Sequence, residues 1–147
     1  MLISRNQFLA AALMTAATLD DDQSSARIDV VQGGLTALER ALPPVRHEST
    51  AQTGIRHSDG TISLARRELG TASGAKFFTC IGKQPALDFG GKRNDDGQGF
   101  AAFGHVTQGM DVVRKIYRQK VDANSGTGPT RGQLLASPVT IQNASRL

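Results

Sequence analysis

Short β-like segments dominate the middle of the chain, and residues 61–65 alternate between polar and apolar side chains, as a half-buried β-strand does. Glycine-rich turn segments separate them, the longest at 90–99. Short strands that alternate with tight turns favour an antiparallel barrel or sandwich over a parallel α/β sheet. We expect these strands at 28–31, 61–65, 77–81, 100–106 and 139–142, with the first one stopped by Gln32-Gly33-Gly34.

Residues 110–117 predict the clearest helix. Apolar residues at helical spacing share one of its faces: Met110, Val113, Ile116 and Tyr117. Basic residues lie mostly away from that face: Arg114, Lys115 and Arg118. A weaker signal at 35–42 predicts one or two helical turns that end at Pro43-Pro44.

The first 20 residues allow two interpretations. Arg5, the apolar run 8–14 and the small residues up to Ala17 have the outline of a secretory signal. The alternative is an ordinary amphipathic helix. On both interpretations, the apolar segment is too short to span a bilayer as a stable membrane anchor. After the polar break at 20–25, we expect one domain over 21–147. We expect a cytoplasmic protein, or a periplasmic or secreted one if residues 1–17 act as a signal.

Composition narrows the function classes. The 147 residues suit a single domain, and 16 glycines suit many tight turns. The net charge of +4 is mild and no run of five basic residues occurs, so we expect no nucleic-acid partner. A single cysteine, Cys80, excludes an internal disulfide and any multi-cysteine zinc site, and we interpret it as a small buried strand residue.

Three segments, taken in order and spacing, resemble the cyclophilin family over residues 27–145. They are 31–34 (Val-Gln-Gly-Gly), then 60–65 followed by Phe77-Phe78, and then 87–90 followed by 99–106 and 109–113. The resemblance implies a closed eight-stranded antiparallel barrel capped by two helices. It also implies rotation about the peptide bond before proline, with no metal or cofactor, and proline-containing peptides or unfolded protein segments as partners. We therefore expect a mainly β, cyclophilin-like barrel with a capping helix, incomplete at its N-terminal strands.

The resemblance also assigns site residues. Gln32 matches the glutamine that orients the substrate backbone, and Phe78 matches the aromatic floor of the proline pocket; we take these two as catalytic. Alternative interpretations are a polar residue at a strand end for Gln32 and plain core packing for Phe78. Four further positions match substrate-binding residues: Ala65, Leu87, Phe100 and Val30.

Several positions depart from the better-known family pattern. Phe100 stands in place of a histidine, Ala86 in place of a tryptophan, and Val30 in place of a larger apolar residue. Asp29 replaces a phenylalanine, and Lys76 falls near a family glutamine. The last two changes leave the substrate preference open, and the sequence does not predict an oligomeric state.

The most serious departure lies upstream of Gln32. The family carries an aromatic-x-Arg strand there, and its arginine donates hydrogen bonds to the prolyl amide. Spacing back from Gln32 puts this strand at 13–15, with Thr15 in the place of the arginine. A threonine hydroxyl offers one donor and no charge, whereas a guanidinium has five donors. Arg5 and Arg27 are the only nearby substitutes, and nothing in the spacing favours either of them.

The first two strands and the first helix of the family also have no clear counterpart. An open barrel exposes strand edges, so we expect marginal stability or edge-to-edge association. Three hypotheses follow: a working isomerase with an unusual N-terminus, a catalytically weak module that binds proline peptides, and a truncated family member with little function.

Overall fold

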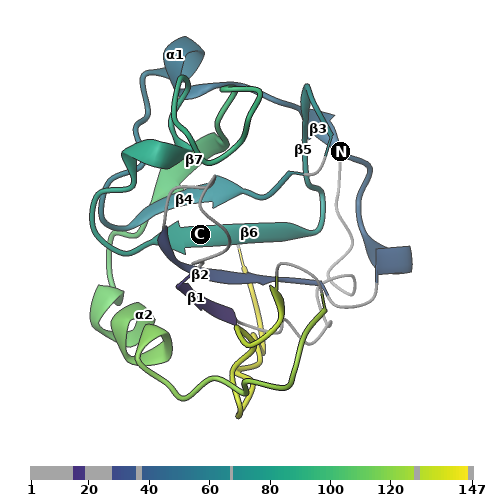
Figure 1. Ribbon diagram of the computed structural model, residues 1–147, viewed down its shortest axis with the longest axis vertical. Coiled ribbons are helices and arrows are strands. Elements are labelled where there is room, and N and C mark those ends of the chain that lie inside the picture. Colours follow the sequence, from purple (N-terminus) through teal and green to yellow (C-terminus); the bar gives the residue numbers. More distant parts are fainter. Residues whose placement is uncertain (1–14, 19–27, 36–37, 67, 128–129, 146–147) are drawn as a thin grey trace.

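A five-stranded antiparallel sheet forms the centre of the computed structural model, which describes residues 15–18, 28–35, 38–66, 68–127 and 130–145. The strands lie in the order β1-β2-β6-β4-β7 (Figure 1). Their bounds are β1 Thr15–Thr18, β2 Asp29–Gly34, β4 Thr61–Leu64, β6 Lys76–Cys80 and β7 Ala101–His105. Within the described part, β1 and β7 are the edges of this sheet, which does not close into a barrel.

The remaining elements are small. A second sheet pairs β3 (Val45–Arg46) with β5 (Thr71–Ala72). The helices are α1 (Thr50–Thr53) and α2 (Met110–Tyr117), and two 3-10 turns are η1 (Leu38–Arg40) and η2 (Pro85–Leu87). None of the described helices is long and apolar enough to cross a membrane.

The mainly β fold and most of its central elements agree with the sequence predictions. The strands expected at 61–65, 77–81 and 100–106 are β4, β6 and β7, each displaced by no more than a residue at either end. The helix α2 has the predicted bounds, 110–117. The helical turns expected over 35–42 reduce to the single 3-10 turn η1.

The predicted stop at Gln32-Gly33-Gly34 is wrong, because β2 continues through both glycines. Gly33 and Gly34 pair with Phe77 and Lys76 in the ladder to β6. Gly34 adopts a φ of 131°, and a Cβ on it would lie 2.1 Å from the carbonyl oxygen of Ala75. Only glycine fits this close approach, so the glycines extend the strand where the sequence suggests a turn.

The strand predicted at 139–142 is also wrong. The structure gives these residues no strand, and the nearby chain makes an antiparallel bridge between Val121 and Leu135. Val139 instead packs against a core cluster built on Val31, Ile116 and Leu135. Its β-branched side chain therefore contributes to the core without joining a ladder.

At the N-terminus, residues 15–18 form the edge strand β1. The helix predicted over 1–20 is therefore wrong at residues 15–18, because β1 pairs with β2 along its whole length. The rest of the predicted helix or signal, 1–14 and 19–20, lies outside the described residues.

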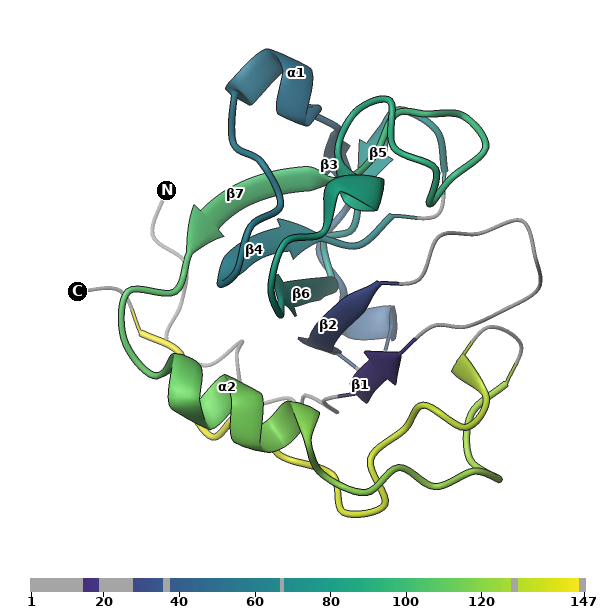
Figure 2. The ribbon, with the colours of Figure 1, turned by 60° about the vertical axis from the view of Figure 1, so that its left-hand side comes forward.

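The two faces of β2 serve two separate cores, because successive strand residues point to opposite faces. Val30 belongs to a cluster with Ile28, Phe78, Cys80 and Leu87. Val31 belongs to the cluster with Ile116 of α2, and Figure 2 shows α2 lying along β1 and β2 on that side. Cys80 is fully buried in β6, as predicted, and burial raises the pKa of its thiol to about 12.

Candidate functional site

The register of β2 on β6 places Gln32 directly opposite Phe78, and Val30 opposite Cys80. The register of β4 on β6 places Ser63 opposite Phe78 on the other side. Residues that lie opposite one another in antiparallel strands share a face of the sheet. The amide of Gln32 and the ring of Phe78, from segments 46 residues apart, therefore face the same side.

A cavity of about 840 Å³ opens on this face. Five of the six site residues assigned from the sequence line it: Gln32, Phe78, Ala65, Phe100 and Val30. Ile28, Ala41, Leu42 and Pro44 add apolar surface. The cavity therefore combines an apolar wall with the side-chain amide of Gln32.

Leu87 departs from the expected position. Its side chain is fully buried in the cluster with Val30 and Phe78, and it is not among the residues that line the cavity. Gly99 approaches it closely, and the amide of Phe100 donates a 2.9 Å hydrogen bond to the Leu87 carbonyl. Leu87 thus supports the cavity from behind and does not form its wall.

The floor of the cavity is an aromatic pair. The rings of Phe78 and Phe100 meet edge to face, with centroids 5.4 Å apart and planes at 85°. Phe78 is 4% exposed, so the space around it is closed to bulk water on the core side. An edge-to-face pair presents a ring face and a ring edge to the same space, a suitable surface for the compact, apolar ring of proline.

Arg66 is a site residue that the sequence did not reveal. Its guanidinium lies 5.6 Å from the centroid of Phe100 and lines the cavity. Its Nε donates to the carbonyl of Gly99 at 2.7 Å, and Nη2 forms an ion pair with Asp96. Because Gly99 lies 33 residues away, no local pattern could have indicated this contact. Arg66 ties the end of β4 to the 90–99 loop and fixes one side of the aromatic floor.

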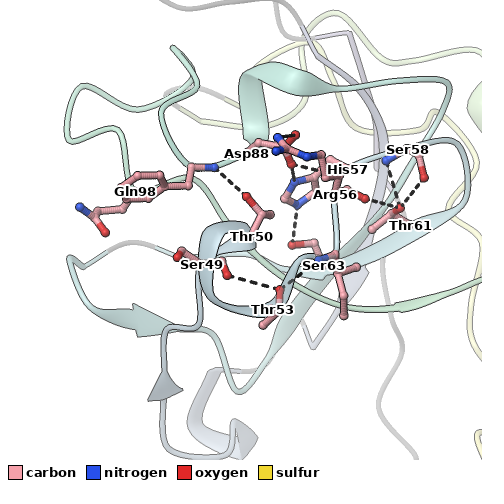
Figure 3. A network of polar contacts seen from close by, with 12 residues as sticks. Ser49, Thr50, Thr53, Arg56, His57, Ser58, Thr61, Ser63, Asp88 and Gln98 are labelled. Atoms are coloured by element: carbon pink, nitrogen blue, oxygen red, sulfur yellow. Dashed lines mark hydrogen bonds and ion pairs between the residues drawn. The ribbon is translucent and has the colours of Figure 1, made fainter.

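A buried polar network surrounds His57 (Figure 3). The His57 ring stacks on Phe78 with centroids 6.0 Å apart. Its Nδ1 is 2.8 Å from Oδ1 of Asp88, and its Nε2 is 3.0 Å from Oγ of Ser63. All three polar residues are at most 5% exposed.

The partners fix the tautomer of His57. A carboxylate only accepts hydrogen bonds, so Nδ1 carries the ring proton and donates a hydrogen bond to Asp88. Nε2 is then unprotonated and accepts a hydrogen bond from the Ser63 hydroxyl. Burial lowers the pKa of His57 and outweighs the opposing effect of the Asp88 carboxylate. The backbone amide of His57 also donates to Asp88 at 3.0 Å, so one carboxylate holds both the ring and the backbone of His57. The network orients the residues behind the cavity, and its own atoms are closed to solvent.

Thr15, which the sequence spacing assigns to the place of the family arginine, lies in the edge strand β1. Thr15 of β1 lies opposite Gln32 in the register of β1 on β2. This strand position is next to the side chain that would hold a substrate backbone. The described residues contain no group of three or more histidine, cysteine or acidic side chains placed to hold a metal ion.

The buried His57 makes the stability of the fold depend on pH. Because the folded pKa is depressed, the unfolded chain binds a proton near pH 6.5 that the folded chain does not. The free energy of unfolding therefore falls below about pH 6.5, by at most about 1.4 kcal/mol per pH unit for one group. Urea unfolding at neutral and mildly acidic pH measures this slope. The variant His57→Gln, which keeps His47 and His105, is expected to have a shallower slope, and an unchanged slope would contradict the assignment.

Comparison with known proteins was consistent with this geometry. Residues 18–145 match the model of the cyclophilin type peptidyl-prolyl cis-trans isomerase/CLD family. The peptidyl-prolyl cis-trans isomerase A of Dickeya dadantii is 33% identical over 102 residues, which is 69% of this chain and 48% of that protein. The isomerase cyp18 of Streptomyces antibioticus is 33% identical over 108 residues, 72% of this chain and 60% of that protein.

A third relative, the peptidyl-prolyl cis-trans isomerase B of Escherichia coli, is 34% identical over 73 residues, half of this chain and 43% of that protein. The chain spans about half the length of the curated relatives it matches. The family match covers most of the chain and includes β2, β4, β6, β7 and α2. The chain therefore belongs to the cyclophilin-type peptidyl-prolyl cis-trans isomerase family.

Proposed function

We propose that the chain catalyses cis/trans isomerisation of X-Pro peptide bonds in peptides and unfolded protein segments, with the cavity on β2 and β6 as the proline site. The observation that carries this proposal is the convergence of Gln32, Phe78 and Phe100 on one cavity with an apolar wall. The family membership of the chain supports it independently.

The chemistry requires no covalent step. Rotation about the prolyl bond has a barrier of about 18–20 kcal/mol because the planar amide is stabilised by resonance. The planar form carries the larger charge separation, so an apolar cavity favours the twisted form relative to water. The side-chain amide of Gln32 forms a hydrogen bond with the backbone of the substrate next to the proline, and this bond holds the substrate while the prolyl bond rotates. Phe78 and Phe100 hold the proline ring itself, so that one end of the rotating bond stays fixed.

An exchange NMR spectrum of an Ala-Pro peptide tests this activity. With the protein present, we expect cis/trans exchange peaks at an NMR mixing time of about one second. Without it, isomerisation of the prolyl bond takes tens of seconds, and no exchange peaks are expected. The variant Gln32→Ala is expected to slow exchange about tenfold, which corresponds to one lost hydrogen bond. Gln119→Ala is the matched control, because this side chain is exposed beyond the end of α2. A well-dispersed protein spectrum without exchange peaks would contradict the proposal.

The second candidate, a module that binds proline peptides with little catalysis, is favoured by Thr15. The residue opposite Gln32 lacks the charged donor that the family places there. On this alternative, the cavity still binds the proline ring, but the prolyl amide receives no charge-assisted hydrogen bond as it twists. Peptide binding without exchange would then be the expected behaviour of the chain.

The substitution Thr15→Arg separates the two candidates. If Thr15 occupies the arginine position, restoring the guanidinium is expected to raise kcat/KM by about 10²–10³, the usual effect of one preorganised donor in a transition state. Thr18→Arg is the control, because it adds the same charge to the same strand at a position paired with Asp29 and not with Gln32. Equal rates for both variants and the wild type would show that Thr15 is not the position that limits catalysis.

A further inference from the structure

The walls of the cavity carry an excess of positive charge. Three cations line it, Arg66, Lys76 and Arg93, whereas Glu68 is the one carboxylate among the described lining residues. Asp96 forms an ion pair with Arg66 at 2.6 Å, outside the lining itself. Even when both carboxylates are counted, the cations exceed the acids by one. A site that only had to accept an uncharged proline segment would not need this excess.

Among the three cations, Lys76 lies on the same strand as Phe78. It precedes Phe78 by two residues in β6, so both side chains lie on the same face of the sheet, about 7 Å apart along the strand. That spacing is about two residues of an extended peptide, a gap that the long, flexible lysine side chain is able to bridge. Lys76 is half-buried, and within the described part of the chain it has no ion-pair partner. Its ammonium is therefore available to a group next to a proline that rests on Phe78.

Asn94 adds a second unused donor. It also lines the cavity, and its buried Nδ2 has no hydrogen-bond partner among the described residues. The atom itself is closed to solvent, so a ligand oxygen would use this donor only after the Asn94 side chain turns toward the cavity. An ammonium and an amide donor in one cavity both suit an oxygen acceptor, and a carboxylate satisfies both.

We infer that the cavity selects proline segments that carry a carboxylate on a residue next to the proline, with Lys76 as the specificity-determining residue. The inference rests on the proposed use of this cavity as the proline site, and it names the class of peptide that the site prefers. The attraction follows from Coulomb interaction at a partly desolvated position, so salt is expected to weaken it.

Matched peptides test the preference. Two series, Ala-Xaa-Pro-Ala and Ala-Ala-Pro-Xaa, carry Glu, Gln or Lys at Xaa, so that Glu and Gln differ in charge but hardly in shape. In at least one series we expect a kcat/KM about three- to fivefold higher for Glu than for Gln, the effect of one partly screened charge pair. The Lys peptide is expected to be the poorest, and added salt is expected to bring the three together.

Variants locate the source of the preference. Lys76→Gln is expected to bring the Glu-to-Gln ratio to about one, whereas Lys83→Gln, the same change at an exposed position outside the cavity, leaves it unchanged. A ratio near one in the wild type, with all peptides isomerised, would overturn the inference and leave the proposed function intact. A ratio that persists in Lys76→Gln would overturn the role of Lys76.

The test also separates failure of the inference from failure of the proposed function. If no peptide is isomerised, the proposed activity fails, and the same series is read as dissociation constants from the amide shifts of the protein. Tighter binding of the Glu peptide, lost in Lys76→Gln, would still support the charge preference. Equal dissociation constants for Glu and Gln would overturn it.

Discussion

The pairing of β2 with β6 is the constraint on which the site depends. It sets Gln32 opposite Phe78, and a slip of one residue would turn every side chain of β2 to the other face. Such a slip would send Val30 toward α2 and Val31 toward the cavity, so that both cores would lose their packing. The close approach of Gly34 to the Ala75 carbonyl opposes a slip that would bring Leu35 to this place, because a Cβ there would clash. The side chains of Gln32 and Phe78 are thus held in place by the same hydrogen bonds that hold the sheet together, and by Gly34.

Polar side chains around the sheet fix the positions of the Phe78 and Phe100 rings. The His57 ring packs against Phe78 and is held on both nitrogens, by Asp88 and by Ser63. Arg66 holds the other side of the floor through Gly99 and lies over the Phe100 ring. A floor fixed from two sides presents its aromatic rings with little rearrangement, and a site preorganised in this way spends less binding free energy on ordering itself. The contacts of His57 do not compete with a bound peptide, because His57, Asp88 and Ser63 do not line the cavity.

Local sequence patterns predicted the elements whose signals are local. Alternation of apolar and polar residues indicated β4, and a 3.6-residue period indicated α2. The failure at 139–142 has a physical cause, since a β-branched run predicts a strand only if a partner strand is within reach, and here Val139 packs by its side chain alone. The small helix α1 was missed, because its capping by Gln52 on Ser49 stabilises only four residues.

The site divides in the same way. Gln32, Phe78 and their neighbours were indicated by a resemblance that spans the chain, and the cavity brings five of the six assigned residues together. Arg66 and the pairing of His57 with Asp88 were not indicated, because their partners lie 33 and 31 residues away and their spacing has no period. Long-range polar contacts of this kind depend on the completed fold and leave no mark on a single sequence.

The central claim is that this cavity holds the proline ring, and contacts between peptide and protein protons test it most directly. Intermolecular nuclear Overhauser effects between a labelled Ala-Pro peptide and the protein would locate the ring. The account predicts effects from the proline γ and δ protons to the ring protons of Phe78 and Phe100. Effects to Phe103, an aromatic side chain on β7 that is 56% exposed, without effects to Phe78 or Phe100, would contradict it.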